Sequence, residues 1–301
     1  VDPETPVDPE IPVDPDPNQP FISSSSAEAS SSSVELPPPG PDRLENITKA
    51  CTMEPPKVTS GKTGWGSRYW DCCKPHCSWR EEVDTNANPF KICKNCNIND
   101  QEISAFVESP NADEWWHGYE GTKSGCDEGG VAYTCYDHAP YAVCEDLAYG
   151  FVAAPGSEAA CGKCFLLEFD GGNKEGNIKD SHRMLAGKRM IVMASNIGHD
   201  VEVGQFDIMI PGGGLGAFAA GCKVQWGVDD TNEDLVGVRF GGLLSKCQQT
   251  HGWDDISALK TCVRGKCDAL FGNKPDMKYL HDGCIWFVDW MHVADNPTYK
   301  Y

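Results

Sequence analysis

Residues 68–79 read Arg-Tyr-Trp-Asp-Cys-Cys-Lys-Pro-His-Cys-Ser-Trp, and they predict more about the fold than any other stretch of the chain. Asp71 stands beside two aromatic residues, and the pair Cys72-Cys73 follows it directly. Adjacent cysteines can fix the backbone around that carboxylate, and the aromatic rings can face a sugar ring. The stretch therefore indicates a rigid acid or base in a polysaccharide cleft, which needs a second carboxylate from elsewhere in the chain.

Cysteines are frequent, with 16 in 301 residues spread from Cys51 to Cys284. An even number of this size predicts disulfides and an oxidising, extracellular setting. Zinc is the alternative, because Cys93-x-x-Cys96 and Cys161-x-x-Cys164 have zinc-like spacing. The cysteines form no compact block with the histidines, so we expect disulfides, no metal and a secreted protein.

Net charge excludes some partners. A charge of −20 repels nucleic-acid phosphates, so we expect no nucleic-acid partner. No apolar run approaches the length of about 18 residues that crosses a membrane. The chain starts at Val1 without a visible signal peptide, which we interpret as a mature or trimmed secreted product. We also expect a monomer.

Residues 1–48 differ in composition from the rest. Proline falls at every third position from Pro3 to Pro15, as in an extended polyproline helix, and a serine-rich tract follows. The first 45 residues carry ten acids and one base. We interpret residues 1–48 as a disordered linker that tethers other modules, and residues 49–301 as a catalytic domain.

From Cys51 onward, short runs with alternating polarity predict strands separated by glycine-rich turns. The expected strands are 131–135, 164–169, 189–194, 205–210 and 285–290. The expected helices are few and short, at 98–109, 215–221 and 254–264. This pattern predicts a mainly β protein, a small barrel with long cross-linked loops.

Two further aspartates are candidate partners for Asp71. Asp207 lies in the apolar run 206–210, where poor solvation favours the protonated form and raises the pKa, as a general acid requires. Asp200 lies in a glycine-bearing loop seven residues earlier and could approach it. The alternatives are an outward-facing strand residue for Asp207 and a solvated loop residue for Asp200.

Several blocks resemble glycoside hydrolase family 45 endoglucanases, in the family's order. They are residues 67–79, 129–135, 205–216 and 294–297. The resemblance implies a six-stranded double-psi β-barrel crossed by an open groove. It also implies inverting hydrolysis of β-1,4-glucosidic bonds within cellulose chains, without a cofactor.

The resemblance assigns roles to residues. It implies that Asp207 is the general acid, Asp71 the general base and Asp200 a mobile-loop residue that assists the acid. The implied sugar contacts are Tyr69, Lys74, Trp79, Phe218 and Phe240. Trp115 and Trp116 lie in an insertion, 108–123, and either extend the groove or pack as a loop cap.

The resemblance also implies disulfides. The implied pairs are Cys72–Cys222, Cys73–Cys126, Cys77–Cys161, Cys93–Cys135 and Cys247–Cys284. We expect Cys262–Cys267 to pair locally, and Cys96–Cys144 and Cys51–Cys164 to account for the others. Gln205 departs from the family, which usually has histidine there, and this change affects hydrogen bonding near the acid.

Other classes fit the sequence less well. Expansins, which loosen walls without hydrolysis, share the barrel and the acid-like aspartate but lack the base that Asp71 would supply. A simple cellulose-binding module has no use for Asp207 or Asp200. No Gly-x-Ser-x-Gly elbow supports a serine hydrolase.

Overall fold

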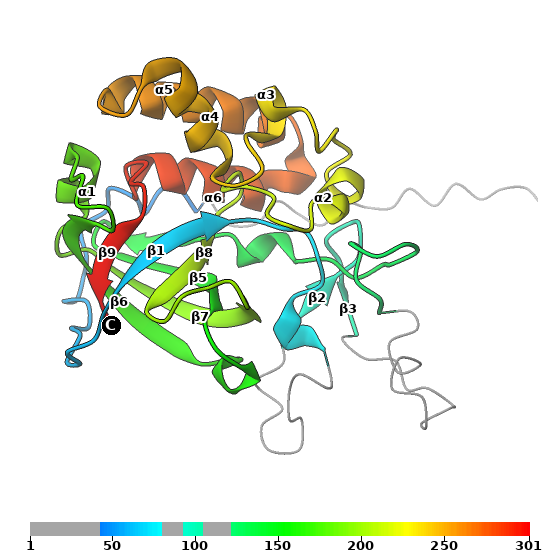
Figure 1. Cartoon of the computed structure of the whole chain (residues 1–301), viewed down its shortest axis with the longest axis horizontal. Coiled ribbons are helices and arrows are strands. Elements are labelled where there is room, and N and C mark those ends of the chain that lie inside the picture. The colour runs from blue at the N-terminus through cyan, green and yellow to red at the C-terminus, as the bar shows by residue number, and fades with distance from the viewer. Residues whose placement is uncertain (1–42, 80–92, 105–121) are drawn as a thin grey trace, which may run out of the picture. The chain divides into compact units, whose positions relative to one another are not determined.

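The computed structural model describes residues 43–79, 93–104 and 122–301 (Figure 1). These residues belong to one compact unit, Pro37–Tyr301. The expected linker at 1–48 lies mostly outside the described residues, so its predicted boundary stays a prediction. The insertion that carries Trp115 and Trp116 lies outside them too.

A closed ring of six strands forms the centre of this unit. The neighbours run in the order β5-β7-β6-β9-β1-β8, and β8 pairs back to β5, while β4 adds to β5 outside the ring. The strands are β1 (Thr63–Tyr69), β4 (Tyr141–Cys144), β5 (Leu147–Ala154), β6 (Cys164–Asn173), β7 (Arg189–Ile197), β8 (Gln205–Met209) and β9 (Pro297–Lys300); β2 (Asn95–Cys96) and β3 (Glu102–Ile103) form a separate small pair. The ring confirms the predicted six-stranded, mainly β barrel.

Two strand pairs in the ring are parallel, β1 with β8 and β5 with β7, and the other pairs are antiparallel. Parallel neighbours cannot be joined by a tight hairpin, so long connections must return the chain to the same end of the barrel. Asp71 lies just after the carboxyl end of β1, and Asp200 lies in the loop that joins β7 to β8. The barrel closes without leaving open edges among its six strands.

Helices α2–α6 gather above the barrel in Figure 1, while α1 lies beside β9. Their bounds are α1 (Asp180–Leu185), α2 (Ala220–Gln225), α3 (Glu233–Val236), α4 (Gly242–His251), α5 (Ile256–Cys267) and α6 (Lys278–Asp289). The expected helix at 254–264 is confirmed as α5. The one expected at 215–221 overlaps α2 only at its end.

Three expected elements differ from the structure. Residues 285–290 lie mostly in α6 and not in a strand. The prediction was wrong because this helix is buried on nearly all sides, so its sequence is a continuous apolar run without the helical period that would distinguish it from a strand. Residues 131–135 make only isolated bridges, from Ala132 and Tyr133. The described part of 98–109 contains the short strand β3 and no helix.

The core fills the barrel and extends beneath the helices. Its fully buried members include Leu167, Met190, Ile208 and Tyr299 from four different barrel strands. Trp70, between the aromatic and acidic residues of the opening stretch, is also fully buried. It therefore packs in the core, whereas its neighbours Tyr69 and Asp71 reach the surface cleft described below.

Seven disulfides join fourteen of the cysteines. They are Cys51–Cys144, Cys72–Cys222, Cys73–Cys126, Cys77–Cys161, Cys96–Cys135, Cys247–Cys262 and Cys267–Cys284, while Cys93 and Cys164 are free. The three expected pairs that involve Cys72, Cys73 and Cys77 are confirmed.

The other expected pairs are wrong for local reasons. Cys96, and not Cys93, reaches Cys135, because its backbone exchanges two hydrogen bonds with Tyr133, while the N–H of Cys93 bonds to Cys77. This corrects Cys93–Cys135 and Cys96–Cys144. Cys51 reaches Cys144 instead of Cys164, since the N–H of Glu145 bonds to the carbonyl of Lys49.

The expected pairs Cys262–Cys267 and Cys247–Cys284 are also wrong. Cys262 and Cys267 both lie on α5, five residues apart, where side chains point in different directions around a helix. Cys262 instead bonds to Cys247 on α4, and Cys267 to Cys284 on α6. These bonds tie α5 to both neighbouring helices.

Within the described segments, no helix is long and apolar enough to cross a membrane.

Candidate active site

A cleft with a volume of about 850 Å³ opens beside the parallel strands β1 and β8. The three candidate acidic residues line it together with the five described candidates for sugar contact. They are Asp71, Asp200 and Asp207 with Tyr69, Lys74, Trp79, Phe218 and Phe240. The structure therefore brings together, in one cavity, residues that are up to 171 positions apart in sequence, from Tyr69 to Phe240.

The register of the parallel pair explains how the two main carboxylates meet. Ser67 on β1 lies opposite Asp207 on β8, and Tyr69 lies opposite Met209. Side chains alternate along a strand, so Ser67, Tyr69 and then Asp71 follow one another on the same face. All three line the cleft.

Asp71 lies just beyond the end of β1, directly before the disulfide-bonded Cys72 and Cys73. The backbone N–H of Cys73 donates a hydrogen bond to its Oδ1 at 3.3 Å. Burial raises the pKa of Asp71 to about 7, although the Cys73 hydrogen bond opposes the shift. Cys72 and Cys73 bond to Cys222 and Cys126, so two distant segments hold the backbone beside this carboxyl group.

Asp207 is held by its neighbour two residues earlier. The side-chain Nε2 of Gln205 donates to Oδ1 of Asp207 at 2.8 Å, and also to Oγ of Ser67 at 2.8 Å. Burial raises the pKa of Asp207 to about 6; the Gln205 hydrogen bond lowers it, and the charge of Asp200 raises it further. Asp207 lines the cleft, and Gln205, the residue that departs from the resemblance, is its hydrogen-bond donor.

The order of these two pKa values is the reverse of what a simple pair needs, because a general base works ionised and a general acid works protonated. Asp71 receives only one hydrogen bond from the described residues, and that bond is long. Hydroxyl groups of a bound sugar or an attacking water that donate to Asp71 would lower its pKa in the loaded cleft. The roles therefore follow from position and resemblance rather than from the pKa order.

Tyr69 is fixed by a residue that the sequence reasoning did not single out. Asn196, in the last part of β7, donates from Nδ2 to the Tyr69 hydroxyl at 3.3 Å, and its Oδ1 accepts the N–H of His76 at 3.0 Å. Burial, with the charge of Asp71, raises the pKa of Tyr69 well above its usual value. Its hydroxyl therefore stays protonated at working pH and can donate to a ligand.

The remaining predicted contacts extend along the cleft. The Nζ of Lys74 lies 4.2 Å from the centroid of the Trp79 ring and donates to the carbonyl of Thr122 at 3.1 Å. Phe218 and Phe240 are 65% and 70% exposed. Both rings line the cleft and present apolar faces on which a ligand can stack.

An ion pair that the sequence did not predict, between Arg68 and Asp295, also lines the cleft. Arg68 contacts Asp295 at 2.5 Å and donates to the carbonyl of Gly241 at 3.0 Å. Burial raises the pKa of Asp295, but the guanidinium of Arg68 outweighs it and holds the pKa below its usual value. The signal was present, since Arg68 and Asp295 stand in two of the recognised blocks. This pair ties β1 to the segment before β9.

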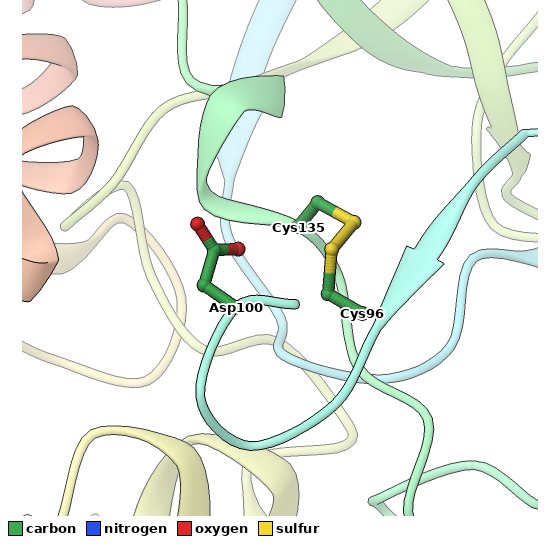
Figure 2. A group of neighbouring side chains, drawn as sticks. All are labelled: Cys96, Asp100 and Cys135. Atoms are coloured by element: carbon green, nitrogen blue, oxygen red, sulfur yellow. A yellow bond between two sulfur atoms is a disulfide. The ribbon is translucent and has the colours of Figure 1, made fainter. Parts of the chain in front are cut away.

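Cys96, Asp100 and Cys135 bring three potential metal ligands within 4.8 Å of one another, as Figure 2 shows. The two sulfur atoms are bonded to each other, so neither is a thiolate ligand. The Asp100 carboxylate instead accepts the N–H of Tyr136 at 2.7 Å. This group is a structural cross-link beside a buried acid.

A closed six-stranded barrel with two buried carboxyl groups and exposed aromatic rings in one cleft defines a glycoside hydrolase type of site. The sequence pattern of Glycosyl hydrolase family 45 matches residues 63–252. The chain belongs to this family.

Named relatives agree with this assignment. The chain is similar to Endoglucanase B of Cellvibrio japonicus, 41% identical over 82% of this chain and 44% of the relative. It is also similar to a putative endoglucanase type K of Fusarium oxysporum, 35% identical over 82% of this chain and 51% of the relative. The chain thus spans about half the length of these two relatives.

A solved structure of another protein has a similar fold. The crystal structure of a cellulase from the Antarctic springtail Cryptopygus antarcticus aligns with 79% of this chain and 88% of its own, with a TM-score of 0.55 and 30% identity. The barrel and its cleft are therefore those of a family whose members include an enzyme described as a cellulase.

Proposed function

We propose that the protein is an endo-acting β-1,4-glucanase that hydrolyses cellulose and related β-glucans with inversion at the anomeric carbon. The observation that carries this proposal is the pair of buried carboxyl groups, Asp71 and Asp207, in one aromatic-lined cleft. The family match and the names of the relatives support it.

The strand register supports inversion. Asp71 is four residues beyond the partner of Asp207, so an extended continuation of β1 would separate the two Cα atoms by roughly 14 Å. Side chains that lean toward each other shorten this span toward the interval of about 6.5–9.5 Å that leaves room for a water. The interval of about 5 Å for a nucleophile would need a much sharper approach.

In the proposed reaction, Asp207 donates a proton to the glycosidic oxygen while Asp71 takes a proton from the attacking water. Asp200 contributes its negative charge beside Asp207, which raises the pKa of the acid and keeps it protonated. Tyr69 donates a hydrogen bond to the sugar at the cleavage point, and Phe218, Phe240 and Trp79 lie against sugar faces. Lys74 orders the Trp79 ring.

The wider setting is part of the proposal. We infer a secreted enzyme that acts as a monomer on insoluble or soluble β-glucan, with residues 1–48 as a linker to other modules. The seven disulfides support an oxidising location. The acidic, proline-rich composition of the first residues supports the linker.

The stereochemistry of the product tests the mechanism. Proton NMR of fresh hydrolysate should show the α-anomer of the new reducing end first, followed by mutarotation. An initial β-anomer would mean retention and would overturn the assignment of Asp71 as a base. The rival expansin-like function predicts no new reducing ends at all, whatever the anomer.

A further inference from the structure

A second cavity, with a volume of about 240 Å³, lies on the other side of residues Asp295 and Asn296 from the cleft. These two residues line both cavities, so they form a shared wall. The second cavity is a little smaller than the range of about 300–1,000 Å³ for drug-sized ligands. That size suits one sugar ring, and we call it the Trp253 pocket.

Trp253 gives the pocket its apolar surface. It occupies the turn between α4 and α5 and is 55% exposed, although it is one of the largest apolar side chains in the protein.

 Ile256 and Leu259, both on α5, line the pocket beside the ring and continue its apolar side. An exposed indole over an apolar floor is the surface on which the C–H face of a sugar stacks.

Two cross-links border the turn that carries Trp253. The exposed carboxylate of Asp254 forms an ion pair with Lys179, just before α1, and both Lys179 and Trp253 line the pocket. Cys247 on α4 and Cys262 on α5 are joined by a disulfide, which ties the two helices on either side of the turn together.

Polar groups line the rest of the pocket. Asn173 and Asn177, with Lys179, supply hydrogen-bonding side chains near the shared wall. Gln248, on α4, is only 6% exposed, and its Oε1 has no hydrogen-bond partner among the described residues, while its Nε2 donates to Oδ2 of Asp295 at 3.4 Å. A buried acceptor without a partner is costly, and a ligand hydroxyl that reached it would satisfy it.

Hydrogen bonds to Asp295 and Asn296 stabilise the shared wall. The side chain of Asn173 donates to the carbonyl of Asp295 at 2.8 Å, and Nε2 of His182 lies 2.7 Å from the same oxygen. Asn296 has a positive φ of 45° and donates from Nδ2 to Glu175 at 3.1 Å. The cleft and the pocket therefore stand at a fixed spacing across this wall.

We propose that the Trp253 pocket binds one sugar residue of a β-linked glucan chain whose cleavage occurs in the neighbouring cleft. The inference rests on the proposed function, because it takes the ligand of the cleft as the same chain. The Trp253 pocket combines Trp253, which lies just outside residues 63–252 that the family pattern matches, with Asn173 and Gln248 inside them. It would favour long chains over short ones.

Binding measured without turnover tests the proposal. In an Asp207→Asn background, calorimetry with oligosaccharides from cellobiose to cellohexaose should show that Trp253→Ala weakens the longest ligands by about 3- to 10-fold. The shortest ligands, which fill only the cleft, should bind unchanged. Trp253→Phe, which keeps a ring, should restore most of the affinity.

Met184→Ala is the matched control, because Met184 is an exposed apolar residue on nearby α1 that lines neither cavity. Equal affinity of Trp253→Ala and the parent for cellohexaose would overturn the proposal, as would an equal loss for cellobiose. If the Asp207→Asn parent bound none of these ligands, the proposed function would fail instead. The two failures are therefore distinguishable.

Discussion

Replacing Asp71 by asparagine should abolish turnover and, at the same time, stabilise the folded protein at alkaline pH. Asparagine has nearly the same shape and can still accept the N–H of Cys73, but it carries no charge. Loss of the base should lower kcat by about 10²- to 10⁴-fold. The stability change follows from the pKa of the group that is removed.

Burial raises the pKa of Asp71 to about 7 in the folded protein, against about 3.9 in an unfolded chain. Because the folded pKa is the higher one, the stability contributed by this group is complete below about pH 4 and is lost as the pH rises through about 7. Three pKa units correspond to about 4 kcal/mol, and solvent in the open cleft reduces this, so we expect a gain of about 2–4 kcal/mol for the variant at pH 8.

Thermal unfolding at a fixed scan rate measures this gain. For a domain of this size, about 2–4 kcal/mol corresponds to a rise in Tm of roughly 5–10 °C at pH 8, which should shrink toward zero at pH 3.5. Asp276→Asn, which removes an exposed carboxylate, is the control and should leave Tm nearly unchanged at both pH values. A Tm that fell by the same amount at both pH values would refute the argument that burial of a charge at Asp71 costs stability.

Three further outcomes follow from contacts in and near the cleft. Gln205→Leu removes the hydrogen bond to the ionised acid, so the basic limb of the pH profile of kcat, which reports the loaded cleft, should move up by about one unit, and an unmoved limb would contradict that role. Phe240→Ala should raise KM for soluble cellulose several-fold with kcat nearly unchanged, because the exposed ring contacts substrate away from the reacting bond; a selective loss of kcat would argue against this. Alkylation of the native protein, read by mass spectrometry, should label the exposed thiol of Cys164 and spare the buried Cys93, and equal labelling would contradict the assigned burial.

Strand prediction succeeded for three short runs rich in apolar residues and missed β1 and β9, where glycine or proline interrupts the pattern. The strands β6, β7 and β8 were all expected, because each contains such a run between turn residues. β1 contains two glycines and β9 begins with proline, so neither shows a period of two. Their pairing to the other strands, which closes the ring, depends on contacts that no local pattern contains.

The candidate site was predictable as a set of residue types but not as a network. The motif around Asp71 and the apolar run around Asp207 identified both carboxyl groups, and the structure places them in one cleft. The register of β1 against β8 places Ser67 opposite Asp207, where Ser67 accepts a hydrogen bond from the same Gln205 amide that donates to Asp207. Such a register is fixed by the whole barrel and cannot be derived from either strand alone.

Disulfide connectivity shows the same limit more sharply, because the number of possible pairings grows steeply with the number of cysteines. The three pairs next to the base were expected through the resemblance, and they are confirmed. The pairs around α5 were not, since the helix expected at 254–264 extends to Cys267 and carries both Cys262 and Cys267. The helical geometry, rather than the spacing, decides which cysteines can meet.

The confirmed disulfides beside Asp71 contribute stability that offsets the cost of burying two carboxyl groups in the cleft. Raised pKa values of about 7 at Asp71 and about 6 at Asp207 together correspond to about 7 kcal/mol at alkaline pH. The disulfides of Cys72 and Cys73 close loops of 150 and 53 residues, which in the chain-entropy account stabilise the fold by about 5 and 4 kcal/mol. These contributions are of similar size and act at the same place. Cross-links beside the base therefore offset the destabilisation that two buried carboxylates impose on the barrel.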